Sequence, residues 1–164
     1  MKKIIFFMLF MIYSVSNSQE LNNSSFDFWL GTWEATWESS EGTTITGTNT
    51  ISKVLDGNVI KEEFEDPSTK FNGLSLSIYN TLTNEWNQTW VDNQGAHYLF
   101  TGTLENGNPV FKTKITEKDG VKIGRKMVFK NISKDAFSWE WLGTKNNGNH
   151  WDVLWKISYV RKQV

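Results

Sequence analysis

The sequence predicts an all-β protein, an antiparallel up-and-down β-barrel of eight to ten strands. Apolar and polar residues alternate with a period of two along most of the chain after residue 30, and short groups of turn residues interrupt this alternation. No segment has the longer period of a crossover helix, so neighbouring strands should run antiparallel. A barrel is favoured because closure removes exposed sheet edges, and a two-sheet sandwich is the alternative.

Turn residues divide the alternating region into ten expected strands. Most divisions contain glycine or asparagine, which accept the positive φ angles of tight hairpins, as in Asp56-Gly57 and Asp119-Gly120. Ahead of the first strand, Ser24 to Leu30 can form one short helical turn with a serine as its cap. The expected strands cover residues 31–39, 43–54, 58–65, 73–80, 85–92, 96–104, 109–117, 121–131, 135–142 and 150–162.

The first 18 residues have the pattern of a secretory signal peptide. Two lysines are followed by an unbroken apolar run, Ile4 to Tyr13, and then by small residues that place the cleavage between Ser18 and Gln19. The apolar run is too short to span a bilayer, which takes roughly 20 helical residues. We therefore expect a periplasmic or secreted protein with no integral membrane segment after processing.

Behind this segment, residues 19–25 are expected to be a linker and residues 26–164 a single barrel domain. Removing the two lysines of the signal peptide leaves 15 basic and 18 acidic residues, a formal charge of −3. The chain has no basic stripe, so nucleic acid is not an expected partner. It has no cysteine, so the domain folds without disulfides. The sequence does not indicate an oligomeric state.

Nine tryptophans stand out in the composition. Residues two or four positions apart share one face of a strand, and most of the tryptophans are spaced in this way. Many of them should form the core, and some should line a cavity, because a barrel filled only by indoles would leave gaps. We expect Trp90, Trp139 and Trp141 to contact a ligand. The pairs expected to share a face are Trp33 and Trp37, Trp86 and Trp90, Trp139 and Trp141, and Trp151 and Trp155.

Alternation also shows which polar side chains point into the barrel. On the strand of Glu62, charged residues at the alternate positions mark the outer face, so Glu62 points inward. On the strand of Arg125, three lysines mark the outer face, so Arg125 points inward as well. Asn49 lies in the row opposite outward threonines, and Gln88 lies in a row of tryptophans. The barrel interior should therefore contain these four polar side chains.

This polar cluster has three interpretations that the sequence leaves open. Glu62 and Arg125 can form a structural ion pair whose spare hydrogen bonds are satisfied by the amides of Asn49 and Gln88, since an unpaired buried charge is costly. Alternatively, the four side chains form the polar floor of a pocket and orient a ligand carboxylate or carbonyl. A β-bulge that turns one of them outward is the third possibility.

The leading functional hypothesis is a binding protein for a small apolar or aromatic molecule, because an aromatic lumen with a few polar groups is typical of ligand sites. The alternative is a small cofactor-free enzyme of the isomerase, cyclase or decarboxylase type. Glu62 would then be the general acid or base, and Arg125 or Gln88 would stabilise an oxyanion. A purely structural protein would instead have a filled interior.

Four separated motifs resemble an exported bacterial family of lipocalin-like domains of unknown function, with the pattern FDFWxGxW … DGxVIxExF … WxQxWVDNxG. They are FDFWLGTWE (26–34), ISKVLDGNVIKEEFE (51–65), GLSLSIYNTLTNEWNQTWVDNQG (73–95) and NNGNHWDVLWKISYVRK (146–162). The resemblance implies a calycin-type barrel, the group that includes lipocalins and fatty-acid-binding proteins.

The resemblance also implies one structural contact and one cofactor alternative. In lipocalin-type barrels a basic residue of the last strand packs across the tryptophan of a Gly-x-Trp motif, which here predicts Arg161 on Trp33, beside Gly31. In the related nitrobindin-like barrels a histidine binds haem iron, which makes His97 a candidate ligand. We expect no metal site, because the sequence has no cluster of His and Cys, and apart from haem we expect no cofactor.

Overall fold

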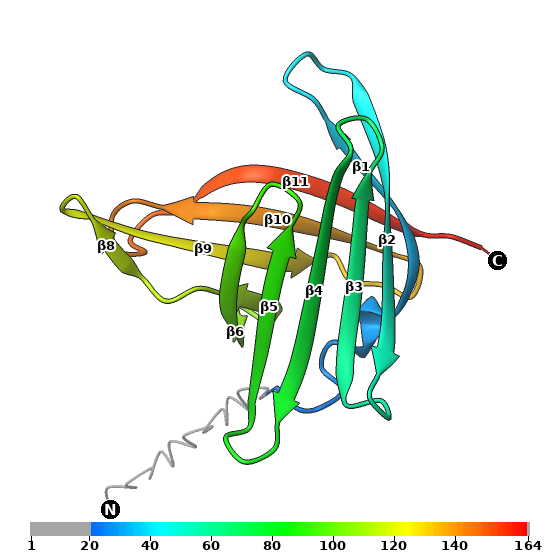
Figure 1. Ribbon diagram of the computed structural model, residues 1–164, viewed down its shortest axis with the longest axis horizontal. Helices are drawn as coiled ribbons and strands as arrows, with labels where there is room; N and C mark the ends of the chain where they lie inside the picture. The colour runs from blue at the N-terminus through cyan, green and yellow to red at the C-terminus, as the bar shows by residue number, and fades with distance from the viewer. Residues whose placement is uncertain (1–20, 164) are drawn as a thin grey trace, which may run out of the picture.

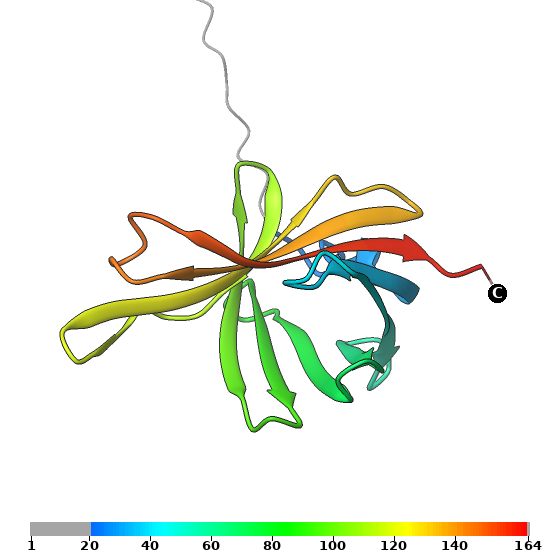
Figure 2. The same ribbon diagram turned by 90° about the horizontal axis from the view of Figure 1, so that it is seen from above.

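The computed structural model describes residues 21–163, which form a closed antiparallel β-barrel (Figure 1). Ten strands make the wall, and the pairing of β9 with β10 and of β11 with β1 closes the ring. From above, the β8–β9 and β10–β11 hairpins extend to one side of the barrel (Figure 2). The strands are β1 (Gly31–Glu38), β2 (Thr44–Val54), β3 (Val59–Asp66), β4 (Phe71–Asn80), β5 (Glu85–Asp92), β6 (His97–Glu105), β7 (Asn108–Lys112), β8 (Thr116–Lys118), β9 (Val121–Lys130), β10 (Ala136–Thr144) and β11 (Asp152–Arg161).

The predicted fold class is confirmed, and nine of the ten expected strands are present with ends within two residues of those expected. The exception is the segment 109–117, which forms two strands. β7 stays in the wall, whereas β8 consists of Thr116, Glu117 and Lys118, all exposed. Because β8 has no apolar side chain to bury, it has no inner face, and it pairs with the end of β9 outside the wall.

A short 3-10 turn, η1 (Asp27–Trp29), lies ahead of β1, in agreement with the expected helical turn. The expected serine cap is wrong, because Phe26 occupies the cap position and its side chain makes no capping hydrogen bond. Asn22 instead orders the approach to η1, since its Oδ1 accepts hydrogen bonds from Ser24 N at 2.9 Å and Ser24 Oγ at 2.8 Å. Within the described residues, no helix has the length and apolar character needed to cross a membrane.

Residues 21–30 close the lower end of the barrel in Figure 1. Phe26 is fully buried, and its ring packs against those of Trp86, Phe111 and Phe129 at centroid distances of 5.1, 4.4 and 5.9 Å. Trp86 Nε1 also donates a hydrogen bond to Asn22 O at 2.7 Å. The described part of the expected linker therefore contacts the barrel. The expected signal peptide lies outside the described residues.

Arg161 covers Trp33 at this closed end, as the Gly-x-Trp motif predicts. Its Cζ lies 4.1 Å from the centroid of the indole ring. The guanidinium also donates hydrogen bonds to Leu30 O at 2.7 Å and to Lys134 O at 2.9 Å. Gly31 has a φ of 124°, and a Cβ at this position would lie 2.2 Å from Arg161 Nη1. Only glycine fits between the strand and the arginine.

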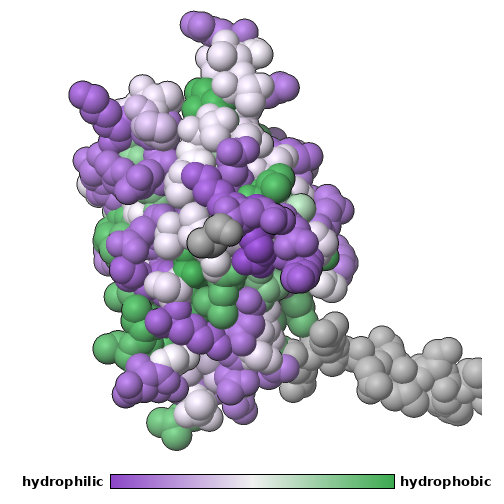
Figure 3. Space-filling model, turned by 90° about the vertical axis from the view of Figure 1, so that its right-hand side faces the viewer, coloured by the Kyte–Doolittle hydropathy of each residue, from purple (hydrophilic) through white to green (hydrophobic). Residues whose placement is uncertain are grey.

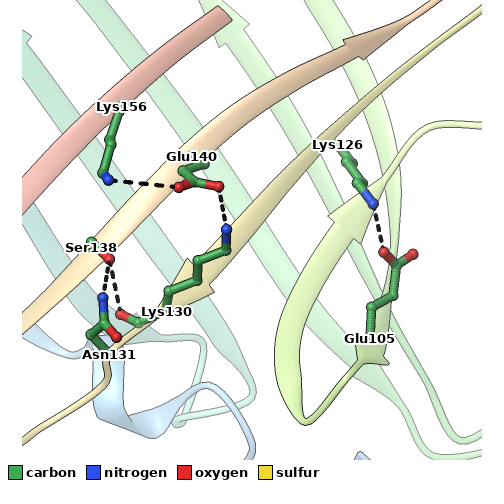
Figure 4. A network of polar contacts seen from close by, with 7 residues as sticks. All are labelled: Glu105, Lys126, Lys130, Asn131, Ser138, Glu140 and Lys156. Carbon is green, nitrogen blue, oxygen red and sulfur yellow. Dashed lines mark hydrogen bonds and ion pairs between the residues drawn. The ribbon is translucent and has the colours of Figure 1, made fainter. Parts of the chain in front are cut away.

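Charged side chains lie on the outer face of β9, β10 and β11 (Figure 4). Lys126 pairs with Glu105 at 2.7 Å, and Glu140 lies between Lys130 and Lys156. Another outer face, shown in Figure 3, is also largely hydrophilic, with the β1–β2 hairpin projecting above it. Two of the three lysines that mark the outer face of β9, Lys126 and Lys130, thus have their acidic partners outside the barrel.

The predicted shared face of Trp151 and Trp155 is wrong. Trp155 packs against the main core, whereas Trp151 packs against a separate small cluster of Val110, Val128 and Leu142. The cause is a β-bulge in the pairing of β10 with β11 next to Trp155. A bulge adds one residue to one strand, so the residues before and after it lie on opposite faces.

We predict that Arg161→Ala destabilises the barrel by on the order of 2 kcal/mol, because it removes a cation–π contact and leaves Leu30 O without its donor. The melting temperature should fall by about 6 °C, measured by circular dichroism. Lys162→Ala is the matched control: Lys162 is exposed and its Nζ donates only to Thr48 Oγ1. Equal melting temperatures for the two variants would contradict the proposed role of the Arg161–Trp33 contact.

Candidate functional site

A cavity of about 290 Å³ lies inside the barrel, at the end away from η1. Gln94 and Ala96 in the β5–β6 turn and Phe71 at the start of β4 form part of its lining, so its mouth lies at the upper end in Figure 1. Most of the lining is aromatic. The lining residues are Glu62, Phe64, Phe71, Trp90, Asp92, Gln94, Ala96, Tyr98, Phe100, Met127, Trp139, Trp141, Trp155, Ile157 and Tyr159.

Two groups of aromatic rings form the walls of the cavity. Trp139 and Trp141 are stacked with centroids 6.2 Å apart, and Trp155 stands edge-on to Trp139 at 5.8 Å. In the other group, Trp90 stacks on Phe71 at 6.4 Å. The structure therefore places all three tryptophans that we expected to contact a ligand on the wall of one cavity.

The middle of the inner row of β4, between Phe71 and Tyr79, is made of small residues, which leaves room for these walls. A Cβ at Gly73 would lie 2.0 Å from the ring of Trp90, so the glycine lets this indole lie across β4. The next two inward residues are Ser75 and Ser77, and both are fully buried. The small side chains of this row provide space inside the barrel.

Buried polar side chains from β2, β3, β4 and β5 form a cluster at the cavity. Glu62 accepts hydrogen bonds from Asn49 Nδ2 at 2.8 Å and from Ser75 Oγ at 2.7 Å. Gln88 Nε2 donates to Ser75 Oγ at 3.3 Å and to Ser77 Oγ at 3.0 Å. All five residues are buried, and Glu62 also lines the cavity. Asn49, Glu62 and Gln88 are thus brought together as the sequence predicts.

The hydrogen bonds of this cluster are directed toward the Glu62 carboxylate. Ser75 donates its only hydroxyl proton to Glu62, so toward Gln88 it can act only as an acceptor, and it accepts the N–H of Gln88. The amide oxygens of Asn49 and Gln88 are consequently turned away from the cluster, and both are buried without a hydrogen-bond partner. Two acceptors are therefore left free, and a buried acceptor without a donor is costly.

The Glu62 carboxylate has no counter-charge in the part of the chain that the structure describes. None of the ion pairs within residues 21–163 includes it. Burial raises the pKa of Glu62 to about 7, and the hydrogen bonds from Ser75 and Asn49 offset this only in part. Burial and the negative charge of Glu62 raise the pKa of Tyr159 well above its ordinary value of 10.0, so its hydroxyl stays protonated.

Of the three interpretations of the polar cluster, the ion pair of Glu62 with Arg125 is wrong. Arg125 Nη1 donates to Gly124 O at 3.0 Å, and the guanidinium lies against Gly143. Arg125 lines a second, more open cleft between β5–β6 and the β8–β9 hairpin. The pairing of β9 with β7 ends at Lys126, so Arg125 lies beyond the end of β7, although it still pairs with Gly143 of β10. The inward row of β9 therefore continues beyond the cavity.

Among the site residues that the sequence prediction missed are Ser75, Ser77 and Tyr159. The register of β4 with β5 places Ser75 opposite Trp90 and Ser77 opposite Gln88, so the inward direction of one strand determines that of the other. This signal is hidden because the serines alternate with leucines, which are exposed on the outer face. The sequence of β4 alone favours the opposite orientation, with the leucines inside the barrel and the serines outside.

His97, the candidate haem ligand, does not line the cavity. It lies on the outer face of β6 and is exposed, at the second cleft. Across residues 21–163, no group of three or more His, Cys, Asp and Glu side chains is arranged to hold a metal ion. The haem alternative stays a prediction, and its candidate ligand lies at the second cleft.

Comparison with known proteins adds no assignment. The chain matches no protein-family model, and a search of curated proteins finds no similar sequence. The resemblance to an exported lipocalin-like family therefore stays a prediction from the four motifs. What the site can do has to be inferred from its own geometry.

We predict that the stability of the protein falls as Glu62 ionises. The pKa of Glu62 is about 7 in the folded chain against an ordinary 4.5, so the folded state binds this proton more tightly than the unfolded state. The stabilisation that protonated Glu62 provides is complete below pH 4.5 and is lost as the pH rises through 7. Relative to Glu62→Gln, the wild type should lose about 3 kcal/mol across this window.

Chemical denaturation at about pH 5 and about pH 8 measures this difference, because the contributions of other groups cancel between the two proteins. Glu65→Gln is the matched control: Glu65 lies on the same strand but is exposed. A constant difference between the wild type and Glu62→Gln at the two pH values would show that Glu62 titrates normally.

Proposed function

We propose that the protein binds a small, largely apolar or aromatic molecule in the barrel cavity. The observation that carries this proposal is the unfilled interior, a space of about 290 Å³ between aromatic walls with a buried polar cluster at its side. Ligand sites generally combine apolar walls with a few fixed polar groups. A structural protein has no need of such a space, because close packing of the interior would be more stable.

The size and shape of the cavity indicate what kind of molecule fits. Its volume is near the lower end of the usual range for ligand pockets, about 300–1,000 Å³. The stacked pair Trp139 and Trp141 and the stacked pair Phe71 and Trp90 present flat surfaces. A compact aromatic compound, or an apolar chain of similar width, can lie between them.

We further propose that binding takes place in the periplasm or outside the cell, after removal of residues 1–18. The basic start and the short apolar run of this segment support export. The four motifs support membership of the lipocalin-like family, whose barrels suit the same kind of function. Both proposals derive from the sequence.

Binding is favoured over the enzyme alternative because the groups suggested for oxyanion stabilisation are not in place. A pKa of about 7 would suit Glu62 as a general acid or base. Arg125, however, lines the second cleft, and Gln88 uses its N–H groups on two serines and leaves only its oxygen free. An amide oxygen cannot stabilise an oxyanion.

We predict that a ligand entering the cavity quenches tryptophan fluorescence in a saturable manner, because Trp90, Trp139, Trp141 and Trp155 line the walls. A panel of basic, neutral and acidic aromatic compounds should be titrated against the purified protein without its first 18 residues. At least one member should give a dissociation constant in the micromolar range, which corresponds to a binding free energy of about −8 kcal/mol.

Trp141→Phe and Trp151→Phe form a matched pair for this titration. The first removes an indole from the cavity wall, and the second removes one from the separate small cluster of Val110, Val128 and Leu142. Trp141→Phe should reduce the quenching amplitude, and Trp151→Phe should leave it unchanged. The proposal fails if no compound in the panel gives saturable quenching, or if the amplitude depends on Trp151 instead.

A further inference from the structure

The charges that line the cavity have one sign. Its two ionisable carboxyl groups belong to Glu62 and Asp92. None of the described residues that line it is a lysine, an arginine or a histidine. The lysines of β9 and Arg125 lie outside the cavity, and Lys126 and Lys130 are paired with outer-face acids. A ligand carboxylate would therefore meet like charges and no counter-charge.

The two acids differ in what they are free to bind. Asp92 holds the β5–β6 turn, because it accepts hydrogen bonds from Trp90 Nε1 at 3.1 Å and from the backbone N–H groups of Gln94 and Ala96 at 3.0 Å. Glu62 has one donor on each of its oxygens. A carboxylate has about four acceptor sites, so Glu62 can accept further donors.

Most of the unused polar atoms around Glu62 are acceptors. The amide N–H groups of Asn49 and Gln88 are already used within the cluster, and their buried oxygens are left free. The hydroxyl of Tyr159, on the wall nearby, can accept as well as donate. A head group rich in N–H donors complements this arrangement, and one rich in oxygen atoms does not.

The aromatic walls favour the same head group. The faces of indole rings carry negative potential and attract cations, with tryptophan the strongest of the aromatic residues. Four tryptophans line the space next to Glu62, and two of them, Trp139 and Trp141, are stacked. A positive charge inside this cavity would be stabilised by the carboxylate and by the rings together.

We infer that the preferred ligand is an organic cation, a protonated amine on an apolar or aromatic body, with its ammonium group at the Glu62 carboxylate and its body between the tryptophans. This inference rests on the proposed binding function and specifies its ligand class. It also accounts for a buried carboxylate that has no protein counter-charge, because the ligand supplies that charge.

Binding should then be linked to the ionisation of Glu62. In the empty cavity its pKa is about 7, and a cation beside it lowers that value. Amine binding near neutral pH should therefore release about half a proton, and affinity should fall as the pH drops below 7. The other titratable groups that face the same cavity are Asp92, Tyr98 and Tyr159. Tyr159 stays protonated across this range, because its pKa lies well above 10.0.

Three probes with the same phenylalkyl body test the inference: 4-phenylbutylamine, 4-phenylbutanol and 4-phenylbutyrate. Calorimetry at about pH 8 should show the amine binding about tenfold or more tightly than the alcohol, and the acid binding most weakly. At about pH 5.5 the advantage of the amine should shrink by about tenfold or more, because a proton then competes for Glu62.

Glu62→Gln should abolish the preference for the amine and leave the affinity for the alcohol little changed. Glu65→Gln, on the same strand but exposed, should bind all three probes like the wild type. Calorimetry of the wild type in two buffers of different ionisation enthalpy gives an independent result that requires no variant: the amine should release protons, and the alcohol should not.

The outcomes separate failure of this inference from failure of the binding function. Equal affinity for the three probes, tightest binding of the acid, or amine binding without proton release would overturn the cation inference and leave the binding function standing. Absence of binding by all three probes, together with no response to the wider aromatic panel, would overturn both.

Discussion

The contact between Arg161 and Trp33 holds together the parts of the chain on which closure of the barrel depends. Trp33 belongs to the first strand and Arg161 to the last, and the two residues are directly paired in the β1–β11 ladder. Arg161 also binds Leu30 O, and Trp33 Nε1 binds Trp29 O at 2.8 Å, so both side chains fix the end of η1. The Arg161–Trp33 cation–π contact therefore lies where the first and last strands pair, and its two side chains also hold the segment that closes this end of the barrel.

The two ends of the barrel interior differ because the segment around η1 fills one of them. At the closed end, Phe26 fills the lumen and packs against rings from β5, β7 and β9. At the other end no such segment enters among the described residues, and the inner row of β4 there is Gly73 and Ser75. Aromatic rings consequently have two roles in one barrel. They pack closely at the end near η1, and they line the cavity at the other end.

The sequence was sufficient for the fold because alternation and turn residues are local signals, and a closed meander uses them on nearly every strand. It was also sufficient for the inward direction of Asn49, Glu62 and Gln88, since each lies in a row with a clear outer face. It failed where the outcome depends on strand ends. Arg125 shares the predicted row, yet it lies beyond the last residue of β9 that pairs with β7. Trp151 lies on the opposite face from Trp155 because of a β-bulge that no residue type in the sequence predicts.

Stability alone does not account for Glu62. A buried charge costs free energy, and replacing buried ionic groups with apolar residues of similar size is often neutral or stabilising. Among the described residues the carboxylate lacks even a partner of opposite charge, and its pKa of about 7 means that folding works against its ionisation at neutral pH. Asn49 and Ser75 nevertheless orient their donors toward it and leave amide oxygens of the cluster unsatisfied. An arrangement that gives up stability to hold a negative charge beside an aromatic cavity supports a binding role, because a cationic ligand would return the stability lost.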